Sequence, residues 1–600
     1  MKSILTKRPR LDHNHRRMGN ARQGMRLSVG AFGAGWLLVV GFLLHLGLRL
    51  AIGLGRAGPV NLADEIGYLA NDRVMSGGIA GELSKASFYR GGYSLLLLPA
   101  YWLGDGPRAQ YHLVLATNAL LSSLVFPLLF VLLTRVFAVP PRTACLAAFL
   151  AALYPPLVVT TQFAWPESLL PVLVIVAAIA LGAMVNAHRP RAAVGWAVAC
   201  GSCAGVLYMT HGRTAPLVLL LVGLLLVLAL LRHDLVASSA AGVLATVVVV
   251  AAGQVLNGWL AARSWGKPGN GDLQHVLANA RDPGSLINVV ALGMGQYWYV
   301  FVATFGLIVL GLVHIGAPLL ARSPSGRRIP LGRAASQKAI AAHAVSIFLI
   351  GSTICMAVLV GLFFRPPVRP DHLVYGRYIE ILVPPLFALG LVRLWTARTQ
   401  RLLLELAVGT AVALAVCLVV AVYAGGLVAR GPVNWISVLT LPPLELGLAR
   451  DHIRLVPATL VALAGTGVLL AVTRRSRRWG ALGLAAVLIV MSVALRVVLI
   501  EAADRAVYGT PVALSQVEGL NSAREVSYDL AAYNPVGLYS YQWQLNHARF
   551  VLFDSTRDRR PRTQWVIAGM DWSQAQQLGA HRIWVHPAYQ QAVWRLPDVG

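Results

Sequence analysis

The stretch TAPLVLLLVGLLLVLALL, residues 214–231, contains no charged side chain and is long enough to cross a lipid bilayer as one helix. Similar apolar runs recur along the 600-residue chain. Apolar residues make up 57% of the sequence and charged residues only 12%, about half the charged share of a typical soluble protein. This pattern predicts an all-α polytopic membrane protein, because a helix satisfies its own backbone hydrogen bonds inside lipid.

We expect about thirteen membrane-spanning helices, each placed on one of these runs. The first run is full length and lacks a small-residue cleavage site, which favours a retained helix over a cleaved signal peptide. The predicted spans are residues 29–53, 109–136, 143–163, 167–187, 192–210, 214–231, 236–257, 294–316, 340–364, 378–396, 402–424, 455–473 and 480–500.

The positive charge follows this topology. The chain has 51 Lys and Arg against 24 Asp and Glu, a formal net charge of +27. The basic residues gather in the N-terminal segment and in the loops 189–191, 322–338, 393–401 and 474–478. With thirteen spans, all these clusters fall on one side, and the positive-inside rule makes that side cytoplasmic. The charge therefore gives no support for nucleic-acid binding.

Three regions follow from composition. Residues 1–28 form a basic cytoplasmic segment, residues 29–500 hold the spans, and residues 501–600 are more polar. In this last region, short alternating runs at Arg549–Phe553, Gln564–Ala568 and Arg582–Val585 predict a small α/β domain outside the cytoplasm. Many more Arg than Lys residues, and spans rich in Ala, Leu and Val, indicate a bacterial plasma membrane protein.

A second set of ionisable side chains, including acids, lies near the ends of spans in segments predicted to be outside the cytoplasm. Such groups are costly near the membrane core, so they suggest a functional site. The candidates are Asp64 and Glu65 in the first outer loop (54–108), Glu167, His211, Arg213, His372, Arg377 and Glu380.

Each candidate also has a purely structural explanation. Glu167 follows a proline and could begin a helix. The pair His211 and Arg213 could anchor the chain at the headgroups. Arg377 and Glu380 are spaced as a helix-surface ion pair, and the Asp64–Glu65 pair could be solvated.

Four short motifs resemble the GT-C superfamily of membrane glycosyltransferases, which includes protein O-mannosyltransferases and the lipid A aminoarabinose transferase. The acidic motif LADEIGYLA (62–70) matches that family's first outer loop, and YRGGYSLL (89–96) is similar to its next helix entry. FAWPESL (163–169) and YGRY (375–378) resemble a second acid site and a late Arg/Tyr motif. The likeness covers roughly residues 29–400. The chain lacks the Trp-Trp-Asp signature of oligosaccharyltransferases.

The resemblance implies transfer of a sugar from a polyprenyl-phosphate donor to an extracytoplasmic glycan, lipid or protein acceptor, usually with inversion. Asp64 would then be the base, with Glu65 or Glu167 orienting a substrate. Arg377 and Arg213 would offset the leaving phosphate, supported by Arg90 and His211. His372 and Glu380 complete the expected substrate-binding set.

A divalent cation, such as Mg²⁺, Mn²⁺ or Ca²⁺, is a further option. Asp64 and Glu65 could hold it against the phosphate, and the sequence leaves metal-assisted and arginine-only catalysis both open.

Two other functions fit a many-spanned chain. A transporter or flippase would favour internal repeats and polar groups at the bilayer midplane. A polyprenyl-linked glycan polymerase or ligase would favour a large late outer loop rich in Arg and His. Ionisable groups gathered toward one face fit a glycosyltransferase better than either.

Overall fold

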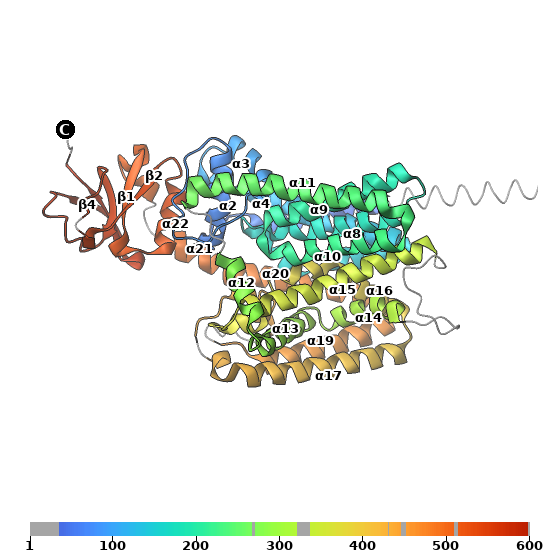
Figure 1. The fold of residues 1–600 in the computed structure, drawn as a ribbon. Helices are drawn as coiled ribbons and strands as arrows, with labels where there is room; N and C mark the ends of the chain where they lie inside the picture. The colour runs from blue at the N-terminus through green and yellow to red at the C-terminus, as the bar shows by residue number, and fades with distance from the viewer. Residues whose placement is uncertain are drawn as a thin grey trace, which may run out of the picture.

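The computed structural model describes residues 35–266, 271–320, 336–429, 431–445, 452–508, 514–557 and 559–597. These residues form a long helical bundle with a small sheet-containing unit at one end (Figure 1). The predicted basic segment 1–28, and the part of the basic cluster 322–338 that precedes residue 336, lie outside the described residues.

Within the described residues, 11 helices are long and apolar enough to cross a membrane, and one bent pair would make 12. The protein is therefore a multi-pass membrane protein. The spans are Gly35–Gly53; Pro107–Val136 with α4 (Pro107–Ser123) and α5 (Val125–Val131); Pro166–Asn186 with α8 (Leu170–Asn186); α9 (Pro190–Thr210); Gly212–Leu231 with α10 (Ala215–Leu231); His233–Trp265 with α11 (Val236–Leu260); α13 (Ser285–Ala303); α15 (Gln337–Phe363); Thr399–Ala429 with α17 (Thr399–Ala424); α19 (Leu455–Arg475); and Arg477–Tyr508 with α20 (Arg477–Leu495) and α21 (Glu501–Tyr508).

The bent pair replaces the single span predicted at residues 143–163. Helix α6 (Pro141–Ala152) meets α7 (Pro155–Val159) and its 3₁₀ extension to Gln162 at an angle of 63°. Pro155 and Pro156 cause the break, because proline cannot donate to the preceding turn. The buried Arg49 donates from Nη2 to the carbonyl of Ala152 at 2.7 Å, which satisfies one acceptor freed by the break.

The prediction of one helix through residues 294–316 is wrong. Helix α13 ends at Ala303, and a second helix, α14, runs from Leu307 to Leu320. Between them, Phe305 and Gly306 have φ of 51° and 72°, a left-handed turn that ends an α-helix. The predicted span 378–396 contains the 3₁₀ turn Glu380–Leu382 and α16 (Val383–Thr396), which is shorter than a typical span.

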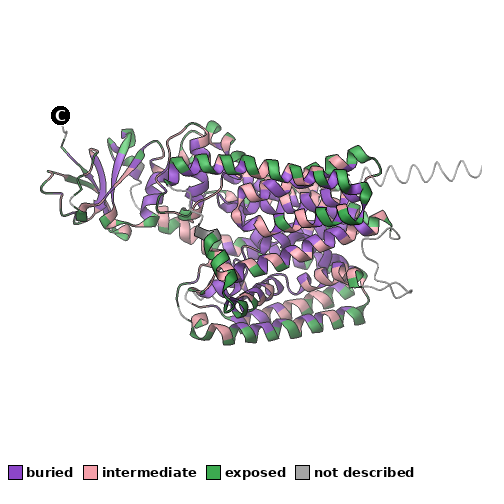
Figure 2. Cartoon of the chain, in the orientation of Figure 1, coloured by how far each residue is buried: buried purple, intermediate pink, exposed green. Residues whose placement is uncertain are grey.

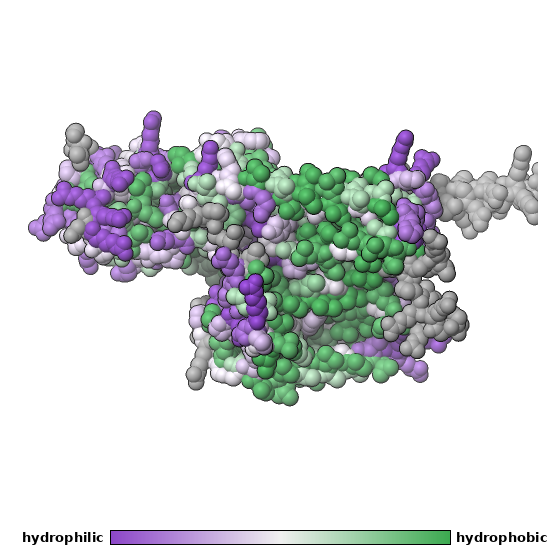
Figure 3. Space-filling model, in the orientation of Figure 1, coloured by the Kyte–Doolittle hydropathy of each residue, from purple (hydrophilic) through white to green (hydrophobic). Residues whose placement is uncertain are grey.

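Burial separates central helices from those that face lipid. The most apolar stretch of Pro166–Asn186 is 78% buried, whereas the corresponding stretch of His233–Trp265 is only 28% buried. Figure 2 shows exposed residues along α11 and α17 and buried residues between the helices. Figure 3 shows an apolar flank over the helices, with hydrophilic residues gathered over the C-terminal unit and at the opposite end of the bundle. This is the surface expected of helices surrounded by lipid.

The C-terminal unit contains a five-stranded mixed sheet in the order β2-β1-β3-β5-β4. Strand β1 pairs in parallel with β2 and β3, and β5 pairs antiparallel with β3 and β4. The three predicted runs are confirmed as strands β2, β3 and β4. The strands are β1 (Glu525–Asp529), β2 (Arg549–Phe553), β3 (Trp565–Gly569), β4 (His581–His586) and β5 (Gln591–Arg595), and helix α22 (Pro535–Gln544) links β1 to β2.

Short helices occupy the polar segments between the spans. The loop after the first span contains α2 (Leu62–Met75), the 3₁₀ turn Ser94–Leu96 and α3 (Leu98–Leu103). Figure 1 places α2 beside α22, with α3 and α21 at the same end of the bundle, the end that carries the C-terminal unit. The remaining short helices are α12 (Gly271–Arg281), the 3₁₀ turns Pro370–Val374 and Trp435–Ser437, and α18 (Leu441–Leu444).

Candidate active site

Arg377 joins two acids that are far apart in the sequence. Its Nη1 donates to Asp64 Oδ2 at 2.5 Å, and its Nε donates to Glu167 Oε1 at 2.6 Å. Arg213 Nη2 donates to the same Glu167 oxygen at 2.9 Å. The structure thus brings together four of the side chains named from the sequence: Asp64, Glu167, Arg213 and Arg377.

The chain positions these groups on element ends. Asp64 is in the first turn of α2, where an acid is favoured by the positive end of the helix. Glu167 follows Pro166 in the 3₁₀ turn that opens into α8. Arg213 is in the turn between α9 and α10, and Arg377 lies between two 3₁₀ turns before α16. All four charged side chains therefore lie at the ends of helices or in turns between them, where they can meet without interrupting an apolar span.

Aromatic rings support both guanidinium groups. The Arg377 guanidinium lies 3.8 Å from the centre of the Trp165 ring, and that of Arg213 lies 4.6 Å from the centre of the Tyr378 ring. Both contacts are within the range of a favourable cation–π interaction. The rings therefore hold the two planar cations in place as well as attracting their charge.

Tyr89 holds the second oxygen of the Asp64 carboxylate. Its hydroxyl donates to Asp64 Oδ1 at 2.6 Å. Burial and the negative charge of Asp64 raise the pKa of the Tyr89 hydroxyl well above its ordinary value, so Tyr89 stays a donor. Burial alone would lower the pKa of Arg377, but Glu167 and Asp64 raise it well above its ordinary value.

Part of the hydrogen-bonding capacity in this cluster is unused. Among the described residues, no partner is found for buried Glu167 Oε2 or for the Nε and Nη1 atoms of Arg213. The side chain of Asp64 is 22% exposed, against 5% for Glu167 and 2% for Arg213. Asp64 is thus the more accessible of the two acids in the cluster. Arg213 retains N–H groups that could donate hydrogen bonds to an anion.

Glu65 does not share the surroundings of Asp64. Successive residues of a helix point in directions about 100° apart, and Glu65 is fully buried on the other side of α2. Its Oε1 accepts from the backbone N–H groups of Val60 and Asn61, both at 2.9 Å. Its Oε2 accepts from the Tyr111 hydroxyl at 2.7 Å and from the backbone N–H of Ala164 at 2.8 Å. Glu65 therefore ties α2 to the turn that carries Glu167.

Arg90 and His211 lie at the border of the cluster. The Arg90 guanidinium lies 4.0 Å from the centre of the Tyr208 ring and donates to Gln254 Oε1 at 3.3 Å. The backbone N–H of Arg213 donates to His211 Nδ1 at 3.2 Å, so His211 caps the turn that carries Arg213. A Cβ atom added to Gly212 would lie 3.3 Å from Arg90 Nε, which places Arg90 against this turn.

Glu380 and His372 have other partners. Glu380 accepts a hydrogen bond from the Tyr299 hydroxyl, and the structure gives no ion pair between Glu380 and Arg377, the helix-surface alternative. His372 stacks on Phe364 with ring centres 4.2 Å apart, and its Nδ1 accepts from Val368 at 3.4 Å. Neither side chain belongs to the ion-pair cluster, which corrects the expectation of one shared cluster.

Several aromatic side chains of the site were not assigned roles from the sequence. Tyr89, Trp165 and Tyr378 all lie inside the motifs quoted for the family resemblance. Each lies within two residues of a charged candidate, Arg90, Glu167 or Arg377, and this is the signal that the sequence offers. The contact of Tyr111 with Glu65 spans 46 residues, and no sequence pattern marks it.

The acidic pair does not fit a metal site. Asp64 and Glu65 face different surroundings, and both oxygens of Glu65 already accept two hydrogen bonds each. Within the described part of the chain, no group of three or more His, Cys, Asp or Glu side chains is arranged to hold a metal ion. A cation held jointly by Asp64 and Glu65 is therefore not supported by this geometry.

These features define a polytopic membrane protein with a buried ion-pair cluster at the end of the bundle near the C-terminal unit. No protein-family model matches the sequence, and no curated protein matches it.

Solved structures give a clear likeness. The chain is similar to ArnT from Cupriavidus metallidurans in the apo state, with a TM-score of 0.54 and 18% identity, over 94% of this chain and 98% of ArnT. The same ArnT bound to undecaprenyl phosphate gives a TM-score of 0.54 and 16% identity, over 93% of this chain and 98% of that one.

The archaeal oligosaccharyltransferase AglB from Archaeoglobus fulgidus, in complex with an inhibitory peptide and a dolichol-phosphate, gives a TM-score of 0.39 and 14% identity over 73% and 56% of the two chains. This likeness is too slight to carry an argument. The ArnT likeness covers nearly all of both chains, so the chain has the fold of ArnT. The resemblance expected from the sequence is confirmed at the level of the fold.

Proposed function

We propose that the protein is an integral-membrane glycosyltransferase that moves a sugar from a polyprenyl-phosphate donor to an extracytoplasmic acceptor. The observation that carries this proposal is the Arg377 bridge between Asp64 and Glu167, with Arg213 beside it. It brings together a partly exposed acid and two cations, as transfer from a phosphate donor requires. The fold is shared with ArnT, which has been solved with undecaprenyl phosphate, and this supports the donor class.

Asp64 is the proposed base. Its carboxylate would take the proton of an acceptor hydroxyl as that oxygen attacks the anomeric carbon of the sugar. The bond from the anomeric carbon to the phosphate oxygen breaks, and its electron pair leaves with the polyprenyl phosphate. A direct displacement of this kind inverts the anomeric centre. Tyr89 would hold the carboxylate in the orientation that the attack needs.

Arg377 and Arg213 are the proposed partners of the leaving phosphate. The phosphate gains negative charge as the glycosidic bond breaks, and guanidinium groups in a buried site offset it strongly. The Nε and Nη1 atoms of Arg213 are buried and have no hydrogen-bond partner among the described residues, so they could donate to a phosphate that enters beside them. Arg90, at the border of the cluster, would extend the positive region toward the lipid carrier. His211, whose Nδ1 accepts a hydrogen bond from Arg213, would contribute as a neutral side chain.

The proposed location is a bacterial plasma membrane, with the site on the outer side. Two of the basic loops predicted to be cytoplasmic lie together, because Arg474 donates to the carbonyl of Ala397 at 3.1 Å. The four core residues of the site belong to none of the basic clusters. This separation supports the orientation given by the positive-inside rule.

The proposal is tested with the Asp64→Asn variant and polyprenyl-phosphate sugars as donors. The amide keeps the shape of the side chain but cannot accept a proton, so transfer should fall at least about 1,000-fold while the protein still folds. The matched control is Asp105→Asn, an exposed acid in the same loop, which should keep full activity. Near-normal transfer by Asp64→Asn would exclude Asp64 as the base.

A further inference from the structure

The chain that follows the last span packs against the first polar loop. Asp504 of α21 accepts from Arg56 Nη1 at 3.1 Å and from the backbone N–H of Ala57 at 3.2 Å. Four residues later, the Tyr508 hydroxyl donates to the carbonyl of Pro59 at 2.7 Å. These contacts hold the backbone immediately before α2, the helix that carries Asp64.

The contacts of Asp504 continue into the candidate site. Arg56 Nη2 donates to the Tyr111 hydroxyl at 3.2 Å, and that hydroxyl donates to Glu65 at 2.7 Å. Glu65 in turn accepts from Ala164, three residues before Glu167. Arg56, Tyr111 and Glu65 are each at most 1% exposed. The path from Asp504 to the two acid-bearing segments is therefore continuous and shielded from water.

Helix α22 of the C-terminal unit contacts the same loop at other points. The Trp543 ring meets the Tyr111 ring edge-on, with centres 5.7 Å apart. Gln542 exchanges two hydrogen bonds with the backbone of Glu82, at 2.7 and 2.9 Å. Tyr111 is thus held by α22 through its ring as well as by Arg56 through its hydroxyl.

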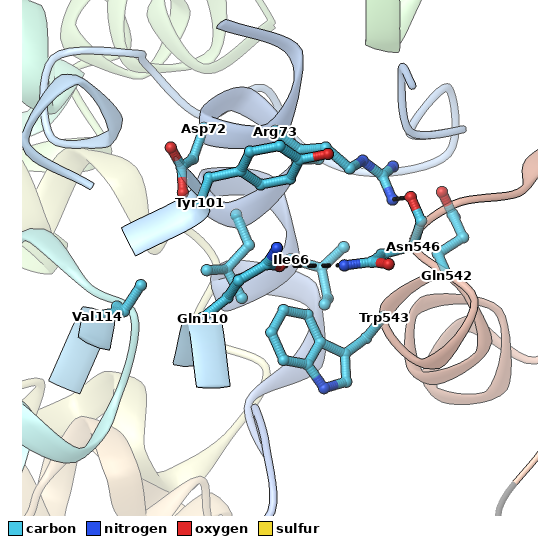
Figure 4. A pocket seen from close by; sticks show the side chains of 11 residues that line it. Ile66, Asp72, Arg73, Tyr101, Gln110, Val114, Gln542, Trp543 and Asn546 are labelled. Atoms are coloured by element: carbon cyan, nitrogen blue, oxygen red, sulfur yellow. Dashed lines mark hydrogen bonds between the residues drawn. The ribbon is translucent and has the colours of Figure 1, made fainter. Parts of the chain in front are cut away.

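Figure 4 shows a further contact, at the other end of α2. Arg73 Nη1 donates to the carbonyl of Asn546 at 2.8 Å, and Asn546 Nδ2 donates to Gln110 Oε1 at 3.1 Å. These residues line a pocket of about 410 Å³, its open mouth included, between α2, α3, α4 and α22. Helix α2 is therefore held at both ends by residues from the last hundred of the chain.

We propose that helices α21 and α22 position the catalytic helix α2, with Asp504 as the key positioning residue for Asp64. The inference rests on the proposed function, because it assigns Asp64 the role of base. Asp64 and Glu65 share the first turn of α2, so a shift of Glu65 also moves the Asp64 carboxylate relative to Arg377. A misplacement of about 1 Å at a reacting group can lower a rate about 100-fold.

The test compares Asp504→Asn with Tyr508→Phe, a milder variant that loses only the hydrogen bond to Pro59. The matched control is Glu525→Gln, an exposed acid of the C-terminal unit paired with Arg549 at 3.8 Å. For each full-length protein, kcat and the KM for donor are measured separately. Hydrogen–deuterium exchange is followed in the peptide that covers α2.

We expect Asp504→Asn to lower kcat roughly 10- to 100-fold with little change in KM, and to speed exchange in α2. Tyr508→Phe should lower kcat and speed exchange in α2 to a smaller extent. Glu525→Gln should change neither kcat nor the exchange rate. A double variant, Asp504→Asn with Tyr111→Phe, should lose less than the product of the two single losses, because both act through one path.

Unchanged exchange in α2 would overturn the positioning role, and so would faster exchange with an unchanged kcat. The exchange measurement does not depend on transfer. A wild-type protein inactive with every polyprenyl-phosphate sugar would therefore count against the proposed function, while exchange in α2 still decides the positioning role.

Discussion

A guanidinium group presents its N–H donors in one plane, and Arg377 uses two edges of that plane for two different acids. The flat face of the same group rests on Trp165. A lysine side chain has no such plane and cannot make both contacts while stacking on an indole. Arg377 thus fixes the distance between Asp64 and Glu167 as well as supplying charge.

The Arg377→Lys variant should lose activity although it keeps the charge. We expect kcat/KM to fall at least about 100-fold, which corresponds to about 2.7 kcal/mol of transition-state stabilisation. The control is Arg369→Lys, whose arginine pairs with Asp371 outside the cluster and should tolerate the change. Equal losses in the two variants would show that Arg377 acts through charge and stability alone.

Removal of divalent cations should leave transfer unchanged. Two arginines can offset the phosphate charge, and Asp64 and Glu65 do not face one another. The measurement is the initial rate of the purified protein after treatment with EDTA and again after addition of Mg²⁺, Mn²⁺ or Ca²⁺. A rate lost with EDTA and restored by one of these ions would require a metal ligand set that includes other groups.

At the scale of single elements, helix α2 has an unusual feature at its end far from Asp64. Asp72 is only 3% exposed, and no partner for its Oδ1 is found among the described residues. Burial raises the pKa of the Asp72 carboxyl to about 7, whereas an unfolded chain has an Asp pKa of about 4. The folded protein therefore holds this proton more tightly than the unfolded chain.

Stability should therefore depend on pH through Asp72. Because the pKa is raised on folding, this group stabilises the folded state below about pH 4, and that contribution is lost as pH rises to about 7. Asp72→Asn should raise Tm by a few degrees at pH 8 and change it little at pH 5. Thermal unfolding in detergent measures this, with Asp105→Asn as control. An equal shift at both pH values would contradict the assignment.

The elements can be predicted from sequence wherever a simple hydrophobic pattern defines them. Residues 214–231 form a long apolar run, and the three strand runs of the C-terminal unit alternate between apolar and polar residues. The break at Phe305–Gly306 was missed because apolar residues surround it, and a left-handed turn changes backbone direction without changing hydropathy. The bend at Pro155 was missed for the same reason, although two adjacent prolines mark it.

The sequence predicts which residues form the ion-pair cluster better than it predicts how their side chains are oriented. Asp64, Glu167, Arg213 and Arg377 were expected together because each follows or precedes a span on one predicted side. The different orientations of Asp64 and Glu65 become clear once α2 is known to be helical, since adjacent helical residues diverge. Two of the partners of Glu65, Tyr111 and Ala164, come from 46 and 99 residues away, and no local pattern specifies them.

At the scale of the whole molecule, the site and the C-terminal unit are joined into one end of a long bundle. Asp504 and α22 contact the first loop, and the first loop carries Asp64. The basic loops at 393–401 and 474–478 contact each other. The positive-inside rule then predicts that the end with the site faces away from the cytoplasm.

Cysteine labelling tests this orientation. In intact cells, a membrane-impermeant maleimide should label an Asp105→Cys variant and leave an Arg189→Cys variant unlabelled; both positions are exposed. The five native cysteines lie within membrane helices, so the wild-type protein serves as the blank. Labelling of Arg189→Cys, with none of Asp105→Cys, would place the site on the cytoplasmic side.

The short contact between Arg377 and Asp64 has a consequence for the order of events. In the protein without ligand, Arg377 holds one oxygen of Asp64 and Tyr89 holds the other, so an acceptor hydroxyl would have to displace one of them to reach the proposed base. Under the proposed function, a lipid phosphate that enters beside Arg377 would compete for the same N–H groups and would release the carboxylate. We therefore expect ordered binding, in which the lipid carrier binds first and the acceptor second. A water molecule that enters without the carrier would then not be activated by Asp64.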